Sequence, residues 1–285
     1  MKHLALITLT LLTAFASVGY AHADSNEIRI AFIAYQNPEQ VIEDVKPVIA
    51  YLEKETGMKV KYNVATNYTG IVEALRNKTA DMGFMGPLQY VMAHHYAGAT
   101  PILGEVYQGK PEYVSRIFVR KDSGIKTIQD LKAKSIAFTD PISSSGYLYP
   151  LELFRSSGLV KKDASEFFKR TYFAGGDEQA IRAVLNGFVD AAGIGQFAYN
   201  LLRPEERSEI ITIADSAPLP SHCVVLREGF SPSMAKKLKK ALLALNEGPN
   251  KHLLQNLYGV DGYVPVTNET YAGVEKVARS HGLLR

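Results

Sequence analysis

Short apolar runs alternate with longer amphipathic segments along most of the chain, a pattern that is typical of α/β architecture. The apolar runs predict strands, and segments with apolar residues every three or four positions, such as Val41, Val45 and Leu52, predict helices. Predicted strands cover 27–34, 59–64, 80–85, 113–120, 135–138, 170–173, 191–194, 210–214 and 224–227. Predicted helices cover 40–56, 68–77, 87–96, 128–131, 146–156 and 178–186, and the tail from residue 232 is mostly helical.

Two segments of the chain resemble each other. Residues 71–81 (IVEALRNKTAD) and residues 181–190 (IRAVLNGFVD) align when Asp81 is placed over Asp190. Both predict an amphipathic helix, a tight turn and a buried strand. In this register two further pairs coincide, Gly86 with Gly195 and Tyr90 with Tyr199. The repetition predicts two similar α/β lobes, and because open α/β sheets bind ligands beyond the carboxyl ends of their strands, we expect a ligand cleft between the lobes.

The first 23 residues have the pattern of a secretory signal peptide. Lys2 and His3 precede an apolar stretch over residues 4–18, which is shorter than the roughly 20 residues of a membrane-spanning helix. The sequence AHA at residues 21–23 offers the small residues that signal peptidase recognises. The alternative is an uncleaved membrane anchor. We expect cleavage after Ala23 and an exported, periplasmic protein that does not itself span the membrane.

Composition narrows the function classes. Of the 285 residues, 46% are hydrophobic and 21% are charged, so the chain can bury a core and is not a disordered protein. The 32 Lys and Arg residues nearly balance the 29 Asp and Glu residues, which leaves no broad positive surface for nucleic acid. The single cysteine cannot form an internal disulfide, and no Cys or His pair has the spacing of a zinc site. We expect no cofactor, no metal and no nucleic-acid partner.

The stretch FTDPISSSGYLYP at residues 138–150 carries the strongest chemical signal. A predicted strand ends at Phe138, Asp-Pro turns the chain, and Ser143, Ser144 and Ser145 precede an apolar helix. The first turn of a helix has unpaired backbone N–H groups and the positive end of the helix dipole. Together with three hydroxyl groups, these N–H groups can receive a tetrahedral oxyanion without a basic side chain. The alternative is an ordinary serine N-cap in a surface turn.

A second helix is predicted to begin at Pro87, directly after a buried strand. We expect Tyr90, one turn inside this helix, either to direct its hydroxyl toward the cleft or to pack on its own lobe. The equivalent segment of the second lobe places Gln196, whose side chain both donates and accepts hydrogen bonds, at the same edge. Asp177 opens the helix before that segment and is either a cleft residue or only an N-cap.

The chain offers no arrangement for catalysis. The serines at 143–145 are not in a G-x-S-x-G elbow, and His94 and His95, adjacent on a predicted helix, point apart. His222 and Cys223, adjacent on a strand, face opposite sides, and we expect Cys223 to be a buried structural residue. We therefore expect a binding protein rather than an enzyme.

These motifs resemble those of periplasmic substrate-binding proteins of ABC importers, of the phosphonate, phosphite or phosphate type. The resemblance extends from Ile28 to Arg227 and more loosely beyond. It is carried by the signal peptide and by five short motifs: TNY at 66–68, GPxxY at 86–90, DPxSSSGY at 140–147, GGDEQAI at 175–181 and NxxxDAA at 186–192. The serine-rich Asp-Pro loop together with Gly-Pro-x-x-Tyr is the most specific combination.

The resemblance implies a type II periplasmic-binding-protein fold, an α/β architecture of two hinged lobes with a ligand cleft between them. Because the chain of such proteins crosses between the lobes twice, it implies a first lobe of residues 24–115 and 219–285 and a second lobe of residues 116–218. The second lobe would hold the oxyanion with the serine turn and the backbone after it: Ser143, Ser144, Ser145, Gly146 and Tyr147. The first lobe would add tyrosine side chains: Tyr90, Tyr35 and Tyr68.

The sequence departs from the family pattern at two positions. Where such proteins often carry a histidine in a Gly-x-His-Asp loop, this chain has Asp177, and where an acidic residue commonly follows the strand of Asp190, it has Gln196. Asp177 either accepts a hydrogen bond from an oxyanion that keeps a proton or points away. The missing carboxylate at Gln196 argues against an aminoalkyl phosphonate, whose ammonium group prefers a negatively charged partner.

The resemblance implies a periplasmic solute-binding protein that captures a small phosphorus oxyanion, namely phosphite, a phosphonate or phosphate. It would deliver this ligand to an ABC permease in the inner membrane, and we expect it to be a monomer. The alternative is a sensory protein of the same fold that presents an oxyanion, including arsenic species, to a membrane sensor kinase.

Overall fold

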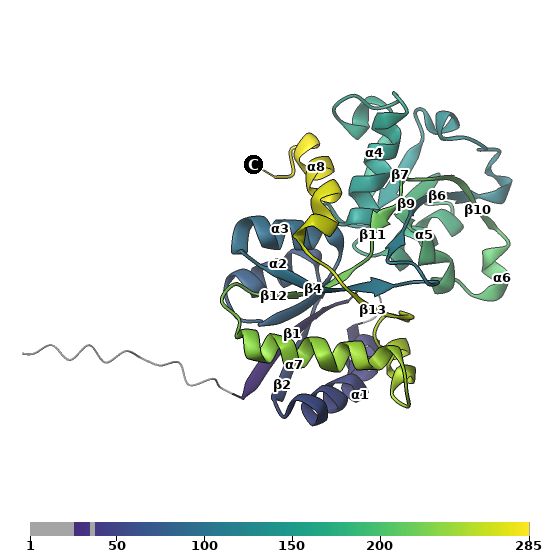
Figure 1. Cartoon of the computed structure of the whole chain (residues 1–285). Helices are drawn as coiled ribbons and strands as arrows, with labels where there is room; N and C mark the ends of the chain where they lie inside the picture. The colour runs from purple at the N-terminus through teal and green to yellow at the C-terminus, as the bar shows by residue number, and fades with distance from the viewer. Residues whose placement is uncertain (1–25, 35–37, 285) are drawn as a thin grey trace, which may run out of the picture.

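The computed structural model describes residues 26–34 and 38–284. These residues form two lobes, each built on one β-sheet, that are connected by extended segments (Figure 1). The predicted signal peptide and Tyr35 lie outside the described residues.

The first lobe has a six-stranded sheet in the order β13-β4-β12-β3-β1-β2. Its strands are β1 (Glu27–Ile33), β2 (Lys59–Ala65), β3 (Met82–Met85), β4 (Thr100–Val106), β12 (Cys223–Leu226) and β13 (Gly262–Pro265). Helices cover both faces because strand side chains alternate between them, so that Ile30 and Phe32 pack with one layer and Ala31 with the other. The first layer contains α1 (Pro38–Thr56) and α7 (Pro232–Leu243), and the second contains α2 (Tyr68–Arg76), α3 (Pro87–Ala97) and α8 (Ala272–Ser280).

The second lobe has a five-stranded sheet in the order β10-β6-β9-β7-β8. Its strands are β6 (Ser115–Arg120), β7 (Ser135–Phe138), β8 (Arg170–Phe173), β9 (Ala191–Gly195) and β10 (Ile210–Asp215). Its helical segments are η1 (Lys121–Ser123), η2 (Ile128–Leu131), η3 (Ser144–Leu148), α4 (Tyr149–Ser156), η4 (Ala164–Glu166), α5 (Asp177–Leu185), η5 (Gln196–Leu201) and α6 (Pro204–Arg207). Residues of α4 and α5 belong to two separate apolar clusters, so this sheet is also covered on both faces.

The two sheets repeat one topology. Strand β1 pairs in parallel with β2 and β3, and β7 pairs in parallel with β8 and β9. A fourth strand, β12 or β6, then pairs antiparallel with β3 or β9. The aligned aspartates have the same role, because Asp81 accepts a hydrogen bond from the N–H of Arg29 on β1 (2.9 Å) and Asp190 accepts one from the N–H of Ser135 on β7 (2.8 Å). The predicted internal repeat is confirmed.

Two short strands lie where the chain passes from one sheet to the other. Strand β5 (Glu112–Tyr113) pairs antiparallel with β11 (Leu219–Pro220). Gln196 holds the segment between β5 and β6, which leads from the first sheet to the second. Its N–H donates to the carbonyl of Val114 (3.1 Å) and its Oε1 accepts from the N–H of Val114 (3.0 Å). The chain therefore crosses between the sheets twice, along two paired segments.

The end of the C-terminal helix also touches both lobes. In Figure 1, α8 lies between α3 and α4. The Nε2 atom of His281 lies 2.6 Å from Oε2 of Glu152 on α4, and Arg155 donates to the carbonyl of Ser280 (2.7 Å). This contact ties the lobes together on their outer side.

The structure matches most of the predicted elements and corrects three. The prediction missed β4, because Pro101 and Gly104 disfavour a strand interior, yet β4 lies between β12 and β13 in the sheet. It also missed β13 within the tail that was expected to be mostly helical. The helix predicted over 146–156 begins earlier, with the single π-helical turn η3, and continues as α4.

Candidate functional site

A cavity of about 480 Å³ lies between the lobes. It is lined by side chains from both lobes and from the crossing segments, and among its described lining residues none is lysine or arginine. Within the described part of the chain, no cluster of His, Cys, Asp and Glu side chains could hold a metal ion. The described lining therefore offers mainly neutral hydrogen-bond donors, together with the imidazole of His222.

Residues Ser143, Ser144 and Ser145, the serine turn, line the cavity on the side of the second lobe. The chain turns after β7, where the N–H of Ser143 donates to the carbonyl of Asp140 (2.9 Å), a turn that Asp-Pro favours. Ser143, Ser144 and Ser145 all line the cavity, and their exposed fractions are 5%, 3% and 7%. Since η3 begins here, the N–H groups of its first residues have no carbonyl partner within the helix.

The three serine hydroxyl groups have different surroundings. Ser143 Oγ accepts from the N–H of Gly146 (3.0 Å) and caps its own turn. Ser144 Oγ accepts from the N–H of Leu88 (2.7 Å), in the first turn of α3, and so links the two lobes. Ser145 lies beside Tyr113, whose pKa is raised far above its usual value by burial and is only partly lowered by this contact.

Gly146 and Tyr147 are not among the described residues that line the cavity. A Cβ atom at Gly146 would lie 2.1 Å from Oγ1 of Thr139, so this glycine allows the serine turn to pack on the end of β7. The ring of Tyr147 packs against Phe138 and Phe173, with centroid distances of 5.3 and 5.1 Å, at the edge of the core of the second lobe. Both residues therefore lie next to the serine turn on the side away from the cavity.

Asp177 lies at the first position of α5 and lines the cavity. Its Oδ1 accepts a hydrogen bond from Oγ1 of Thr139 (2.5 Å). Burial raises the pKa of Asp177, and the hydrogen bonds from Thr139 and from the N–H of Gly195 only partly oppose this rise. The second carboxyl oxygen is on the side of Gly195 and Ser145, because a Cβ atom at Gly195 would lie 3.4 Å from Asp177 Oδ2 and 3.2 Å from Ser145 Oγ.

Tyr68 is the first residue of α2 and lines the cavity from the first lobe. Burial raises the pKa of its hydroxyl well above the usual value, and the nearby side chain of Ser143 partly offsets the rise. Gln89 holds this helix start in place, because its Nε2 donates to the carbonyl of Tyr68 (3.0 Å) while its Oε1 accepts from the N–H of Gly86 (2.7 Å).

Tyr90 and Gln196 do not reach the cavity. Tyr90 donates to Oδ1 of Asn268 (2.6 Å) and packs against Tyr271, because a helix rotates by about 100° per residue and turns this position toward the C-terminal segment. Gln196 instead holds the backbone of Val114, as described above. Tyr35 lies outside the described residues, so its predicted contact stays a prediction.

The cavity is also lined by residues that the sequence did not indicate as ligand contacts, and four of them bear on its chemistry. Tyr113 lies on β5, is 3% exposed, and has a buried hydroxyl without a hydrogen-bond partner among the described residues. Phe197, and not Gln196, lines the cavity after β9. Glu105 is on the missed strand β4, and His222 precedes β12. The sequence did contain one signal for Glu105, because a single acidic residue within an apolar run indicates a buried charge with a specific role.

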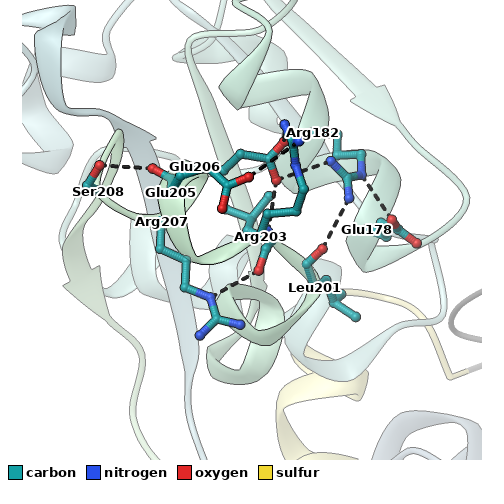
Figure 2. Close-up of polar contacts among 9 residues, drawn as sticks. Glu178, Arg182, Leu201, Arg203, Glu205, Glu206, Arg207 and Ser208 are labelled. Atoms are coloured by element: carbon teal, nitrogen blue, oxygen red, sulfur yellow. Dashed lines mark hydrogen bonds and ion pairs between the residues drawn. The ribbon is translucent and has the colours of Figure 1, made fainter.

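An ion-pair network holds the segment that carries Phe197 (Figure 2). Segment η5 ends at Leu201, whose carbonyl accepts a hydrogen bond from Nη2 of Arg182 on α5 (3.2 Å). Arg182 Nη1 also lies 3.5 Å from Oε2 of Glu206 on α6, and the other labelled residues in Figure 2 extend these contacts. Since α5 begins with Asp177, the network fixes Phe197 and Asp177 relative to each other.

Comparison with known proteins agrees with this architecture. The profile of the family described as "ABC transporter, phosphonate, periplasmic substrate-binding protein" matches residues 30–271. The chain belongs to this family. It is 28% identical over 275 residues to the phosphate-import protein PhnD of Mycolicibacterium smegmatis, and the match covers 88% of this chain and 84% of that protein.

Two solved structures share the fold of this phosphonate-family protein. A binding protein component of an ABC phosphonate transporter from Pseudomonas aeruginosa has a TM-score of 0.82 and 24% identity, over 91% of this chain and 87% of that one. PhnD1 from Prochlorococcus marinus in complex with methylphosphonate has a TM-score of 0.80 and 21% identity, over 90% and 98%. The predicted type II periplasmic-binding-protein fold is confirmed.

Membership in this family also establishes the role of the protein and the cell compartment in which it works. The protein is the periplasmic substrate-binding component of a phosphonate-type ABC transporter, with a small ligand and a permease as its partners. Among the described residues, no helix has the length and apolar character needed to cross a membrane.

Proposed function

We propose that the protein binds a small phosphorus oxyanion, namely phosphite, a phosphonate or phosphate, in the interlobe cavity and delivers it to its permease. The observation that carries this proposal is the buried serine turn at a helix start, in a cavity whose described lining holds no lysine or arginine. Such neutral donors suit a singly charged oxyanion that must later be released. The named ligands of two similar proteins, phosphate and methylphosphonate, support this class.

In this proposal the oxyanion lies on the backbone N–H groups of Ser144 and Ser145. The hydroxyl groups of Ser145, Tyr113 and Tyr68 are further donors. Asp177 accepts a hydrogen bond from a ligand oxygen that keeps its proton, which selects a monoanion over a dianion. Ser143 shapes the turn by capping it. Four of the predicted residues then support the site without touching the ligand: Gly146, Tyr147, Tyr90 and Gln196.

We also propose a cleavage site, an oligomeric state and lobe boundaries for the protein. The signal peptide is cleaved after Ala23, and the mature protein is a monomer. The first lobe comprises residues 24–115 and 219–285 and the second lobe residues 116–218, with β5 and β11 as the hinge. The protein captures and releases its ligand without converting it chemically.

Isothermal titration calorimetry with phosphite, methylphosphonate, phosphate and sulfate tests the proposal. We expect at least one phosphorus oxyanion to bind in preference to sulfate. Tyr113→Phe should weaken this binding about tenfold, because it removes a hydrogen bond to a charged group. Tyr147→Phe is the matched control, since it removes a hydroxyl outside the cavity, and should leave the affinity unchanged. Absence of binding by every phosphorus oxyanion, or equal effects of the two variants, would contradict the proposal.

A further inference from the structure

The turn between α5 and β9 carries the most exposed large apolar side chain of the described residues. Phe188 is 78% exposed. Its N–H donates to the carbonyl of Ala183 (2.9 Å), the N–H of Gly187 donates to that of Val184 (3.0 Å), and Gly187 has a positive φ of 72°. These bonds form a Schellman motif, in which the residue at the place of Phe188 often packs on the one at the place of Ala183. The methyl group of Ala183 offers little surface to a phenyl ring, and the ring stays in solvent.

The repeat in the first lobe shows that this turn needs no apolar residue. After α2, the N–H of Thr79 donates to the carbonyl of Ala74 (2.9 Å) and the N–H of Lys78 donates to that of Leu75 (3.1 Å). Thr79 therefore has the position of Phe188 in the same motif and is polar. Phe188 also belongs to none of the apolar clusters among the described residues. Its ring thus serves neither the turn nor the core.

Basic side chains lie at the same end of the second sheet. Lys134 precedes β7, Lys169 precedes β8, and Arg170 is the first residue of β8. Strand pairing brings them together, because the N–H of Lys169 donates to the carbonyl of Lys134 (2.8 Å). Arg120 is also close to the turn, but it forms an ion pair with Asp122 and adds no net charge.

The charges of Lys134, Lys169 and Arg170 are open to a partner. All three residues are exposed, and none forms an ion pair with a carboxylate in the part of the chain that the structure describes. The acid next to the turn, Asp190, accepts its hydrogen bonds from Ser135. Although burial opposes it, these bonds and the charges of Lys134 and Lys169 lower the pKa of Asp190, so both lysines are near the turn.

The equivalent end of the first lobe has no such excess of positive charge beside its turn. Arg29 pairs with Lys61 in the first sheet as Ser135 pairs with Arg170 in the second, so Lys61 has the place of Arg170. Lys61 forms an ion pair with Glu27 (3.1 Å). The combination of an exposed ring and unpaired cations therefore belongs to the second lobe and not to the repeated topology.

We propose that Phe188, Lys134, Lys169 and Arg170 form a surface that binds an anionic lipid bilayer. The cationic groups contact lipid phosphates, and the phenyl ring enters the boundary between head groups and acyl chains. A folded protein partner fits less well, because a stable protein interface needs a broad, well-packed apolar patch, and here one ring projects among cations.

This surface is remote from the ligand cavity. Strand β9 begins beside the turn and ends at Gly195, which lines the cavity, so the two sites lie at opposite ends of one strand. Lipid contact at this end leaves the cavity open to ligand. It would hold the exported carrier at the membrane that contains its permease.

Co-sedimentation with lipid vesicles tests this inference on the protein without its predicted signal peptide. One set of vesicles is phosphatidylcholine alone, and the other contains equal amounts of phosphatidylcholine and phosphatidylglycerol. We expect binding to the anionic vesicles only, and we expect added salt to weaken it because salt screens exposed charges.

A pair of double variants separates this surface from net charge. Lys134→Gln with Lys169→Gln should weaken binding to the anionic vesicles about twentyfold, since each basic residue near an anionic bilayer contributes about fivefold. Lys236→Gln with Lys237→Gln is the matched control, because it removes the same charge from exposed positions on α7 and should leave the binding unchanged.

A second pair tests the ring. Phe188→Ser should weaken vesicle binding about tenfold, because apolar surface no longer leaves water. Tyr96→Ser, at an exposed aromatic position on α3, should have no effect. The chain contains no tryptophan, so Phe188→Trp and Tyr96→Trp each introduce a single fluorophore. Anionic vesicles should shift the emission to shorter wavelength in Phe188→Trp alone.

The outcomes do not depend on the proposed ligand, because they are measured without it. Absence of vesicle binding, or equal binding to both lipid mixtures, would overturn the inference. So would a loss of binding in the α7 variant that equals the loss in the second-lobe variant, or an unshifted emission of Phe188→Trp in bound protein.

Discussion

The two lobes place different chemistry at equivalent positions. Tyr68 is the first residue of α2, which follows β2, and Asp177 is the first residue of α5, which follows β8. Both line the cavity, one with a hydroxyl and one with a carboxyl group. The repeated topology thus determines where a side chain meets the ligand, and the residue type at that position decides whether it donates or accepts.

The lobes differ more strongly in the strand that lies beside the antiparallel strand β12 or β6, namely β4 in the first sheet and β10 in the second. In the first sheet β4 follows β12 and carries the buried Glu105, which has no ion pair with lysine or arginine among the described residues, whereas in the second sheet β10 follows β6 and carries Asp215. The side chain of Asp215 is 45% exposed and pairs with Arg116 at 3.0 Å. An acid at the surface is neutralised by a partner and by water, while one oxygen of Glu105 has no hydrogen-bond partner in the part of the chain that the structure describes.

The largest expected contrast concerns the repeated aspartates. Asp81 pairs with both Arg29 (2.9 Å) and Arg227 (2.7 Å), so Asp81→Asn leaves two arginines without their carboxylate and should lower the free energy of unfolding by about 3 kcal/mol. Asp190→Asn weakens hydrogen bonds to Ser135 and should cost about 1 kcal/mol. Urea-induced unfolding measures both, and equal losses would show that the ion pairs add nothing to stability.

A second contrast appears in the pH dependence of stability. The pKa of Glu105 rises from its ordinary value near 4.5 to about 8 on folding, so the folded state holds this proton more tightly and stability falls as pH increases through that range. The pKa of His222 is lowered to about 4, so its opposite contribution is complete above pH 6.5. Between pH 6.5 and 8, Glu105 alone of this pair titrates.

Unfolding experiments at three pH values within that window isolate the effect. The wild-type protein should lose up to about 2 kcal/mol between pH 6.5 and 8, because one proton difference changes stability by about 1.4 kcal/mol per pH unit. Glu105→Gln should lack this loss. The control Glu275→Gln, whose carboxylate pairs with Arg279 on α8, should retain it, and a wild-type curve that is flat over the window would contradict the assignment.

The equivalent cavity residues provide a third test, of ligand affinity. Asp177→Asn and Tyr68→Phe should each weaken the binding of a protonated oxyanion about tenfold, because the first removes a charged acceptor and the second, like Tyr113→Phe, removes a hydroxyl donor to a charged ligand. Calorimetry of methylphosphonate at two pH values on either side of its second ionisation measures both variants. The wild-type protein should prefer the monoanion, and Asp177→Asn should lose that preference; a preference that survives the substitution would exclude this role for Asp177.

The smallest effect is expected for the repeated tyrosines. Tyr90 donates to Asn268 (2.6 Å) and Tyr199 donates to the carbonyl of Ile210 (2.5 Å), so each fixes an outer element of its own lobe. Tyr90→Phe and Tyr199→Phe should each lower the free energy of unfolding by about 1 kcal/mol. Ligand affinity measured on the same preparations should not change, and a loss of affinity in Tyr90→Phe alone would restore its predicted role at the cleft.

Local patterns in the sequence predicted much of this fold. The alternation of apolar runs and amphipathic segments, and the alignment of Asp81 with Asp190, depend on residues close in the chain and gave the repeated α/β lobes. The serine turn was visible for the same reason, since turn chemistry, strand end and helix start lie within one short segment. These features arise from backbone propensity and local hydrogen bonding, which a single stretch of sequence contains.

Only the tertiary structure decided which side chains face the ligand. Tyr90 appeared to lie at the cleft edge, but packing against Tyr271 turns it away. Glu105 and His222 are far apart in the sequence, and the pairing of their segments in the first sheet brings them together. Their burial follows from how the two sheets and the crossing segments enclose one space. Such convergence of distant segments has no local signal in the sequence.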